Sequence, residues 1–385
     1  MIERAAGRGN VLQNSAHWRL VMSQRKKICI NTGGGDAPGL NAVIEAVTMA
    51  AYNRGWEVYG IKSGYTGLLN TEEIIHLTPD KVDGIASIGG TILGSTNKGN
   101  PFMMPVCNVA GECEQRDLSD KVLANFRRLG FDALVAVGGD GSLDIAHRFA
   151  AKGMPVIGVP KTIDNDIGGT VISFGFDTAV SIATEAIDRL HSTARSHDRV
   201  MVVEVMGRNA GFIAINSGIS GNADVILIPE IPFDINNVCE KLMENELRGH
   251  KYAIVVVAEG AVPMGGDVIT KRDPELGRQH VILGGMAEHV AKEISLRTGK
   301  DTRSMVLGHL QRGGSPTTFD RLLSLRFGAA AVRAIEEGKF DMMVALRSPE
   351  IVLVPLEEAL SIQKRVLINS DTVLTGRDLG ICFGD

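Results

Sequence analysis

The chain has 385 residues, of which 44% are hydrophobic and 22% are charged, and its formal net charge is −5. This composition is typical of a folded globular protein, and the length favours two or three lobes over a single core. The cationic residues are scattered, so the sequence shows no electrostatic footprint for nucleic acid or an anionic membrane, and no apolar run reaches the roughly 20 residues that span a bilayer.

The N-terminal segment and the cysteines indicate the compartment. Residues 1–26 have no continuous hydrophobic region of the signal-peptide kind, and their basic residues leave a transit segment open beside a surface tail or a start-site artefact. We leave them outside the fold as an N-terminal extension. The cysteines form no CxxC pair, and their odd number argues against a secreted disulfide framework; they are Cys29, Cys107, Cys113, Cys239 and Cys382. We therefore expect a cytoplasmic protein.

Short aliphatic runs alternate with longer amphipathic segments along the chain. Runs of four to seven mostly aliphatic residues that end in glycine, proline or an acid predict strands buried on both faces; they lie in 26–34, 56–62, 132–140, 154–161, 199–207, 224–230 and 251–260. Helices are predicted within 39–55, 142–153, 178–196 and 284–299. This alternation predicts an α/β fold with largely parallel sheets and ligands at the carboxyl ends of the strands. Residues 95–118 have no clear period and are predicted to be a loop or an insertion.

The first chemical motif is "NTGGGDAPGLNA", residues 31–42, between a predicted strand and a predicted helix. Gly33, Gly34 and Gly35 allow close approach of a ligand to the backbone, and the helix N-terminus behind them suits phosphate. The run matches neither GxGxxG nor GxxxxGK[ST], so a tight connection without a ligand stays open.

The second motif is "VAVGGDGS", residues 135–142, which ends a buried strand. Asp140, flanked by Gly139 and Gly141 and followed by Ser142, is suited to holding Mg²⁺ while glycine amides cradle a polyphosphate. The motif indicates phosphoryl transfer without naming the acceptor, and a structural turn is the alternative.

The third motif, "PKTIDND", covers residues 160–166. A carboxylate near a metal site can accept the proton of an acceptor hydroxyl. Asp164 and Asp166 would face opposite sides of an extended segment and therefore divide the work. The residues alone do not decide which is the base.

Five segments in order resemble the signatures of the 6-phosphofructokinase family, which phosphorylates the C1 hydroxyl of fructose 6-phosphate. They read "GGDAPGLNA", "GGDGS", "PKTIDND", "VMVVEVMGRNAG" and "VLGHLQRGGSPTTFDR", and the match runs from about residue 27 to about 345. The resemblance implies two Rossmann-like three-layer lobes with the active site between them. The donor-binding lobe would hold 27–175 and about 310–360, and the sugar-phosphate lobe 176–309 and about 361–385.

The resemblance also implies residue roles. Asp164 would be the general base, and the catalytic group would comprise Lys161, Thr162, Asp164 and Arg208. Donor binding would involve Gly34, Gly35, Asn97, Lys98, Gly139, Asp140, Gly141 and Ser142, with Asp140 associated with Mg²⁺. The sugar phosphate would contact Thr162, Ile163, Asp164, Met206, Gly207, Arg208, Glu259, His309, Leu310, Gln311 and Arg312. Arg199 and Arg303 match arginines that enter from a neighbouring subunit, which implies a homo-oligomer, a tetramer or a dimer.

Two departures from the family pattern matter. In "LGSTNK", Asn97 stands where many members have an arginine that touches the transferred phosphate, and we hypothesise that Lys98 supplies the charge. Glu45 and Met49 stand where regulated bacterial enzymes carry basic residues for a phosphorylated effector. We therefore expect weak or absent control by ADP or phosphoenolpyruvate at that position.

The donor and the acceptor are not settled by the motifs. In this family, glycine at position 141 leaves room for the nucleoside of ATP, whereas an aspartate there resembles the pyrophosphate-dependent type, so Gly141 favours ATP. Lys161, in contrast, is typical of pyrophosphate users. The chain thus resembles a mixed subgroup, and we favour ATP because a point charge at Lys161 serves either donor. A dinucleotide or lipid kinase, a catalytically silent sugar-phosphate sensor, and sedoheptulose 7-phosphate as a second acceptor are the alternatives.

Overall fold

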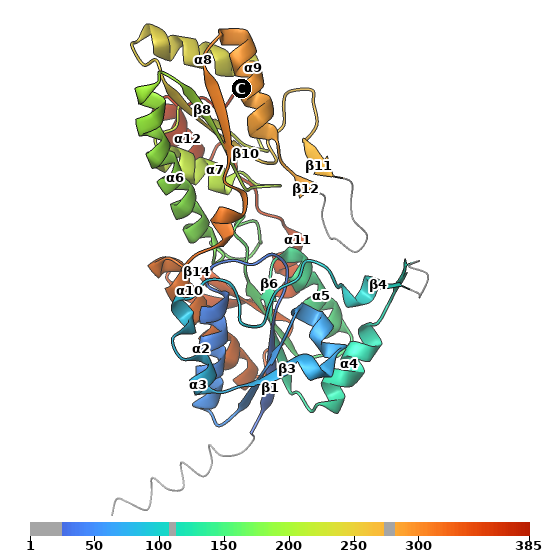
Figure 1. The fold of residues 1–385 in the computed structure, drawn as a ribbon. Helices are drawn as coiled ribbons and strands as arrows, with labels where there is room; N and C mark the ends of the chain where they lie inside the picture. Colours follow the sequence, from blue (N-terminus) through green and yellow to red (C-terminus); the bar gives the residue numbers. More distant parts are fainter. Residues whose placement is uncertain (1–24, 108–112, 273–281) are drawn as a thin grey trace, which may run out of the picture.

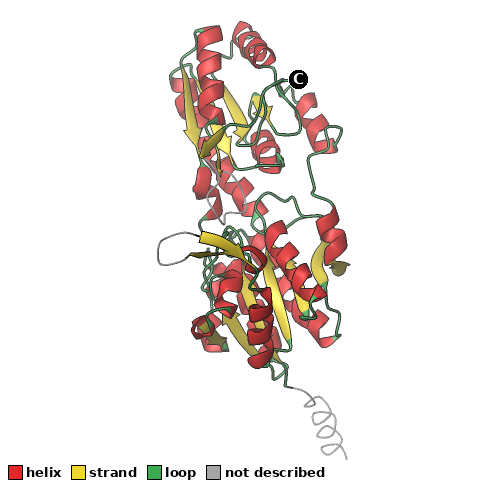
Figure 2. Cartoon of the chain, turned by 90° about the vertical axis from the view of Figure 1, so that its right-hand side faces the viewer, coloured by secondary structure: helices red, strands yellow, loops and turns green. Residues whose placement is uncertain are grey.

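The computed structural model describes residues 25–107, 113–272 and 282–385. They form two lobes stacked end to end, each with a central sheet between helices (Figure 1). A view turned by 90° shows the same arrangement (Figure 2).

The first lobe contains a seven-stranded sheet in the order β15-β14-β7-β6-β1-β2-β3. Its strands are β1 (Lys27–Thr32), β2 (Glu57–Ile61), β3 (Ile74–Leu77), β6 (Ala133–Gly138), β7 (Val156–Pro160), β14 (Met342–Arg347) and β15 (Glu350–Pro355). The inner strands pair in parallel, and the two edge strands β3 and β15 are antiparallel to their neighbours. Every residue of β6 and β7 is buried, because helices cover both faces of the sheet.

Two helix layers enclose this sheet. On one face lie α2 (Leu40–Tyr52) and α10 (Thr318–Glu336), and on the other lie α4 (Ser119–Arg128), α5 (Asp140–Ala151) and α11 (Leu356–Ser361). The strand residues alternate between the two cores: Ile28 and Ile30 pack on the side of α2, and Cys29 packs on the side of α5. Shorter elements of this lobe are α3 (Pro79–Val82), η1 (Gly64–Leu68), η2 (Thr71–Glu73), η3 (Ile85–Ser87) and η4 (Pro101–Met103).

The second lobe is built on a parallel sheet in the order β13-β8-β10-β9. Its strands are β8 (Val200–Val205), β9 (Val225–Leu227), β10 (Ala253–Ala258) and β13 (Thr302–Val306). Its helices are α6 (Phe176–Ser196) and α7 (Phe212–Ser220) on one face and α8 (Ile235–Leu247) and α9 (Met286–Thr298) on the other. A hairpin of β11 (Thr270–Arg272) and β12 (Ile282–Leu283) and the turn η5 (Gly308–Arg312) complete the lobe.

The C-terminal segment crosses from one lobe to the other. After α11, which packs against α5 in the first lobe, the chain reaches α12 (Asp371–Asp378), which packs against α7 in the second. Ile381 and Phe383 are buried in the second lobe's core. The C-terminal tail therefore packs on both lobes.

The predicted elements agree well with the structure. The seven predicted strands are all strands and the four predicted helices are all helices, so the α/β fold class is confirmed. The exact lobe boundaries stay a prediction. No helix in the described ranges combines the length and apolar character that a bilayer crossing requires.

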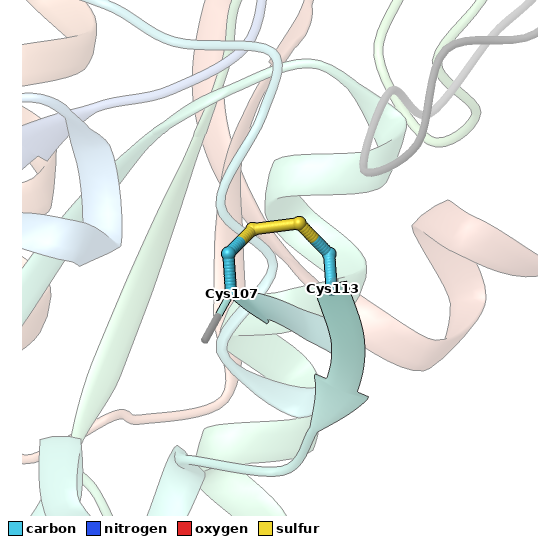
Figure 3. The surroundings of a disulfide bond; sticks show 2 residues. All are labelled: Cys107 and Cys113. Atoms are coloured by element: carbon cyan, nitrogen blue, oxygen red, sulfur yellow. A yellow bond between two sulfur atoms is a disulfide. The ribbon is translucent and has the colours of Figure 1, made fainter. Parts of the chain in front are cut away.

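The segment 95–118 is not simply a loop. Part of it forms a hairpin of β4 (Met104–Cys107) and β5 (Cys113–Arg116). The residues of β4 are mostly half-buried and those of β5 are exposed, and neither strand gave a hydrophobic period. A disulfide joins Cys107 to Cys113 across this hairpin (Figure 3), while Cys29, Cys239 and Cys382 are free. Counting cysteines missed this bond, because its partners are brought opposite each other by strand pairing rather than by a sequence motif. This is a single local disulfide and not the disulfide framework that the sequence argued against.

Candidate active site

A cavity of about 1020 Å³ lies where the two lobes face each other, and residues of both lobes line it. The first lobe contributes residues that follow β1, β6 and β7, and the second contributes residues that follow β8 and β10 and part of η5. Carboxyl ends of parallel strands meet at one edge of a sheet, which is where open α/β sheets bind ligands.

The loop after β1 and the start of α5 form one wall. Gly34 has φ 78°, in the left-handed region, and its N–H donates to the carbonyl oxygen of Thr96 at 2.9 Å. A Cβ at Gly33 would lie 2.6 Å from Ser142 Oγ and 3.2 Å from Ser142 Cβ, so glycine allows the two segments to approach closely. Asp140 begins α5 and accepts a hydrogen bond from the Gly141 N–H at 2.7 Å. The amino end of α5 therefore opens on the cavity, where its positive dipole end favours phosphate.

Lys161 supplies a buried cation to this wall. Only 3% of the residue is exposed, and its Nζ donates to the carbonyl oxygen of Gly35. Burial, and then the neighbouring Arg312, lower the pKa of Lys161 to about 8. The amine stays mostly protonated at neutral pH. The nearby charges of Asp36, Asp140 and Asp164 oppose the lowering of its pKa.

Asp164 is the most strongly perturbed acid of the cavity. Its Oδ1 is buried and has no hydrogen-bond partner among the described residues. Burial, and then the charge of Asp166, raise the pKa of Asp164 to about 7, against opposing effects of Arg312 and Arg208. A carboxylate with an unsatisfied oxygen and a pKa near neutrality is suited to accepting a proton from a bound hydroxyl.

Asp164 and Asp166 do not face opposite sides, so that prediction is wrong. Asn165 between them has φ 53°, in the left-handed region, and this turn brings both carboxylates to the cavity. The Asn165 Oδ1 accepts from the Ser173 N–H at 3.1 Å, which holds the turn. Asp166 accepts from Thr162 Oγ1 at 3.3 Å and from Gln363 Nε2 at 3.1 Å.

The second lobe contributes the opposite wall. Arg208 follows β8 and Glu259 follows β10, and burial raises the pKa of Glu259 while Arg208 opposes the shift. Gly260 is required here, because a Cβ would lie 1.9 Å from the carbonyl oxygen of Arg208. Arg312 spans the cavity from η5, and its Nη1 donates to the carbonyl oxygen of Asp36 at 2.9 Å.

Most of the predicted site residues meet in this one cavity. They are Gly34, Gly35, Asn97, Gly139, Asp140, Gly141, Ser142, Lys161, Thr162, Asp164, Met206, Arg208, Glu259, His309 and Arg312.

Other predicted residues lie beside or behind the lining. Lys98 lines a small second cavity that shares Thr96, Asn97 and Ser142 with the first. Ile163 and Gln311 are fully buried, and Gln311 Oε1 accepts from the Met206 N–H at 3.3 Å, so it supports the wall from behind. Gly207, with φ 139°, shapes the turn before Arg208, and Leu310 is 68% exposed.

Arg199 and Arg303 are not brought into the cavity. Both pair with Asp301, and Arg199 Nε donates to its carboxylate at 2.5 Å. Their role in the site of a neighbouring subunit therefore stays a prediction.

Several cavity residues were missed. They are Asp36, Gly90, Thr91, Ser95, Thr96, Glu204, Asn209, Leu283, Val306 and Gly308. Asp166 also lines the cavity; the sequence named it beside Asp164 as a candidate base but gave it no site role. Asp36 and Asp166 stand inside the quoted motifs, so the motifs could have found them. Thr91 carries no such signal: it is placed by a hydrogen bond of 3.1 Å between its Oγ1 and that of Thr32 at the end of β1.

Comparison with known proteins identifies relatives over nearly the whole chain. The family model described as Phosphofructokinase matches residues 27–335. ATP-dependent 6-phosphofructokinase 1 of Synechocystis sp. is 49% identical over 367 residues, covering 94% of this chain and 100% of the relative. ATP-dependent 6-phosphofructokinase of Chloroflexus aggregans is 51% identical over 363 residues, with coverages of 94% and 99%. Pyrophosphate–fructose 6-phosphate 1-phosphotransferase of Streptomyces coelicolor is 47% identical over 360 residues, with coverages of 93% and 100%.

Solved structures agree. Phosphofructokinase of Pichia pastoris in the T-state superposes with a TM-score of 0.76 at 32% identity, covering 93% of this chain and 37% of that longer chain. Pyrophosphate-dependent phosphofructokinase of Marinobacter aquaeolei gives a TM-score of 0.74 at 25% identity, with coverages of 94% and 92%.

Proposed function

This chain belongs to the phosphofructokinase family, and we propose that it is a cytoplasmic glycolytic enzyme that transfers a phosphoryl group from ATP to the C1 hydroxyl of fructose 6-phosphate. The observation that carries the proposal is Asp164, a buried carboxylate whose Oδ1 has no partner among the described residues and whose pKa is about 7. A silent sugar-phosphate sensor has no use for such a base. The ATP-dependent names of the Synechocystis and Chloroflexus relatives support ATP as the donor.

The two walls of the cavity divide the substrates. The amino end of α5, with Gly34 and Gly35 opposite, receives the donor phosphates, and the second-lobe wall of Arg208, Glu259 and Arg312 binds the sugar phosphate. Arginine suits the ester because its planar fork makes bidentate phosphate contacts. The donor lobe then comprises 27–175 and about 310–360, and the sugar-phosphate lobe the rest.

Proton and charge movements follow from these positions. Asp164 takes the proton of the C1 hydroxyl as the C1 oxygen attacks the γ-phosphorus of ATP. Asp164 must be ionised to accept this proton. Lys161 and the backbone N–H groups at the start of α5 stabilise the charge on the transferring group, and they are already in place before reaction. Thr162 Oγ1 accepts from the Asp164 N–H at 3.1 Å and so fixes the base's backbone.

Asp140 is proposed to hold Mg²⁺. Burial, and then the charge of Asp140, raise the pKa of Asp166 in the same cavity, and a divalent cation beside Asp140 would relieve this repulsion. No group of three or more acidic, histidine or cysteine side chains suited to a metal occurs among the described residues. This fits Mg²⁺, which commonly uses one or two carboxylates together with substrate phosphates and water. When bound, the ion neutralises charge on the donor phosphates.

A homo-oligomer, a tetramer or a dimer, completes the proposal. Arg199 and Arg303 lie outside the cavity of their own chain and are proposed to reach a neighbour's sugar-phosphate site. Edge strand β13, which carries Arg303, also exposes the apolar side chain of Met305, which is 39% exposed. An exposed apolar edge strand suits a subunit interface.

The test is the initial rate of fructose 6-phosphate phosphorylation with Mg²⁺, with ATP and pyrophosphate as parallel donors. Turnover with ATP supports the proposal, and turnover with pyrophosphate alone assigns the donor of the Streptomyces relative instead. No turnover with either donor, in protein that still binds fructose 6-phosphate, indicates the sensor. Sedoheptulose 7-phosphate in the same assay tests the second acceptor, and Asp164→Asn is the control for base-dependent turnover.

A further inference from the structure

Residues 362–370 connect α11 in the first lobe to α12 in the second. They come from the part of the chain that carries no family motif, and none of them lines the cavity. Yet the segment runs directly beside the turn that holds Asp164 and Asp166: Gln363 forms a bridge with Ile167, almost 200 residues earlier in the sequence.

Gln363 and Lys364 bind the catalytic turn at several points. The Lys364 N–H donates to the carbonyl oxygen of Asp166 at 2.8 Å, and Gln363 Nε2 donates to the Asp166 carboxylate at 3.1 Å. The Lys364 ammonium donates to Asn165 Oδ1 and to the carbonyl oxygens of Thr170 and Val171, each at 3.0 Å. An ammonium has three donors, and three acceptors converge on this one.

The Asn165 contact has a specific consequence. Asn165 occupies the left-handed region, which residues other than glycine seldom adopt, and this turn presents both carboxylates to the cavity. Lys364 and the Ser173 N–H hold the same Asn165 oxygen. The tail therefore stabilises the one backbone conformation that places Asp164 in the site.

Two residues further on, the segment binds the second lobe. The Val366 N–H donates to Glu230 Oε1 at 2.8 Å, and the Val366 side chain is buried in that lobe's core. The Glu230 carboxylate also accepts from the Gly211 N–H at 3.1 Å. Gly211 closes the loop that carries Arg208, so residues 363–366 are joined to both walls of the cavity.

We propose that residues 363–366 form an interlobe strap that sets the position of Asp164 relative to the Arg208 loop, with Gln363 and Lys364 as positioning residues for phosphoryl transfer. The proposal rests on the proposed function for its kinetic part. Neither side chain touches the cavity, so the strap acts on the rate of the chemical step through the geometry of the base. Misplacing a reacting group by a small distance lowers the rate of that step more than it weakens binding.

The experiment compares Lys364→Met, which keeps the side-chain length but removes the ammonium, with Gln363→Leu and a control, Arg377→Met. Arg377 lies in the same tail and pairs with Asp385, away from the catalytic turn. Each purified full-length protein is assayed for kcat and KM, for thermal unfolding, and for hydrogen exchange of peptides covering residues 163–171.

Lys364→Met is expected to lower kcat about 10- to 100-fold, as loss of a supporting partner typically does, while KM for fructose 6-phosphate changes by no more than about threefold. Hydrogen exchange should become faster in residues 163–171. Arg377→Met should change stability alone. A kcat within about twofold of wild type for folded Lys364→Met, with exchange of 163–171 unaltered, overturns the strap.

Gln363→Leu keeps the test decisive if Lys364→Met does not fold, because Gln363 is exposed and its removal deletes one hydrogen bond to Asp166. A fall in kcat of a few-fold with faster exchange in 163–171 supports the strap, and wild-type values for both contradict it. Exchange is measured without substrates. If the wild type transfers phosphate from neither donor, the proposed function fails, while faster or unaltered exchange of 163–171 still supports or overturns the strap.

Discussion

Replacing Asp164 by asparagine should make the protein more stable at alkaline pH and nearly inactive. In the folded chain, burial and the charge of Asp166 raise the pKa of this carboxyl from its ordinary 3.8 to about 7. Between these two values the native state holds the proton more tightly than the unfolded chain does. Stability due to this group is therefore full below about pH 4, falls as the pH rises, and reaches its minimum above about pH 7.

The size of the effect follows from the shift. One pKa unit corresponds to about 1.4 kcal/mol, so ionising Asp164 in the native state costs about 4 kcal/mol at pH 8, an order-of-magnitude figure. Asparagine cannot ionise and avoids this cost. For a chain of this length, about 4 kcal/mol corresponds to about 5 °C in Tm. About 1 kcal/mol of this cost is already present at pH 4.5, because the unfolded carboxyl is mostly ionised there. The advantage of Asp164→Asn over wild type should therefore be about 4 °C larger near pH 8 than near pH 4.5.

Thermal unfolding of ligand-free protein at several pH values measures this difference, and any pH-independent effect of the amide cancels. Asp120→Asn is the control, because the Asp120 side chain is 91% exposed. In parallel, kcat should fall about 10²- to 10⁴-fold in Asp164→Asn, the usual loss for a general base. A Tm difference between Asp164→Asn and wild type that does not vary with pH would refute the assignment of a raised pKa to this residue.

Three further outcomes are expected. Gly141→Asp should lower kcat/KM for ATP by about 100-fold or more, because a carboxylate would face the donor phosphates. An unchanged ratio of ATP to pyrophosphate turnover would exclude a role of Gly141 in donor selection. Gly260→Ala should destabilise the chain by about 1–3 kcal/mol through overpacking, because its Cβ would meet the Arg208 carbonyl oxygen at 1.9 Å; wild-type stability to denaturant would contradict the clash. Mixing Arg303→Ala with Asp164→Asn subunits, each nearly inactive alone, should restore part of the activity through hybrid sites, and no recovery on co-refolding counts against shared sites.

Buried strands were predictable because helices on both faces of a parallel sheet demand uninterrupted aliphatic runs. A strand at the edge of a sheet can be partly exposed, and it is then harder to recognise from the sequence. Most residues of β13, at the edge of the second sheet, are exposed in one chain, and β15, at the edge of the first, is only partly buried. The edge strands β3, β13 and β15 were not predicted, although the edge strand β9 was. Among the described inner strands only β14 was missed.

The site shows the same division between local and long-range information. Asp140, Lys161 and Asp164 were found because each stands in a motif directly after a buried strand, where local order determines position. Gln363 and Lys364 were missed because their partners lie almost 200 residues away and form no motif with them. The left-handed turn at Asn165 was missed for a related reason: it is stabilised by distant donors rather than by glycine.

The choice of donor cannot depend mainly on Lys161. Its ammonium is buried, donates to the Gly35 carbonyl oxygen, and lies near the carboxylates at the reaction centre. If the transferring phosphoryl group lies there, as proposed, this charge should act equally on ATP and pyrophosphate. The two donors differ in what extends beyond this group, and we expect that part to lie near Gly141, beside the small second cavity lined by Tyr65, residues 96–100 and Ile145. Tyr65 is buried, and its hydroxyl donates to the Ser142 carbonyl oxygen at 2.9 Å, which ties that region to the phosphate-binding end of α5. We therefore expect discrimination between donors to depend on the space around Gly141 and residues 96–100, and we expect Lys161 to contribute to the rate with either donor.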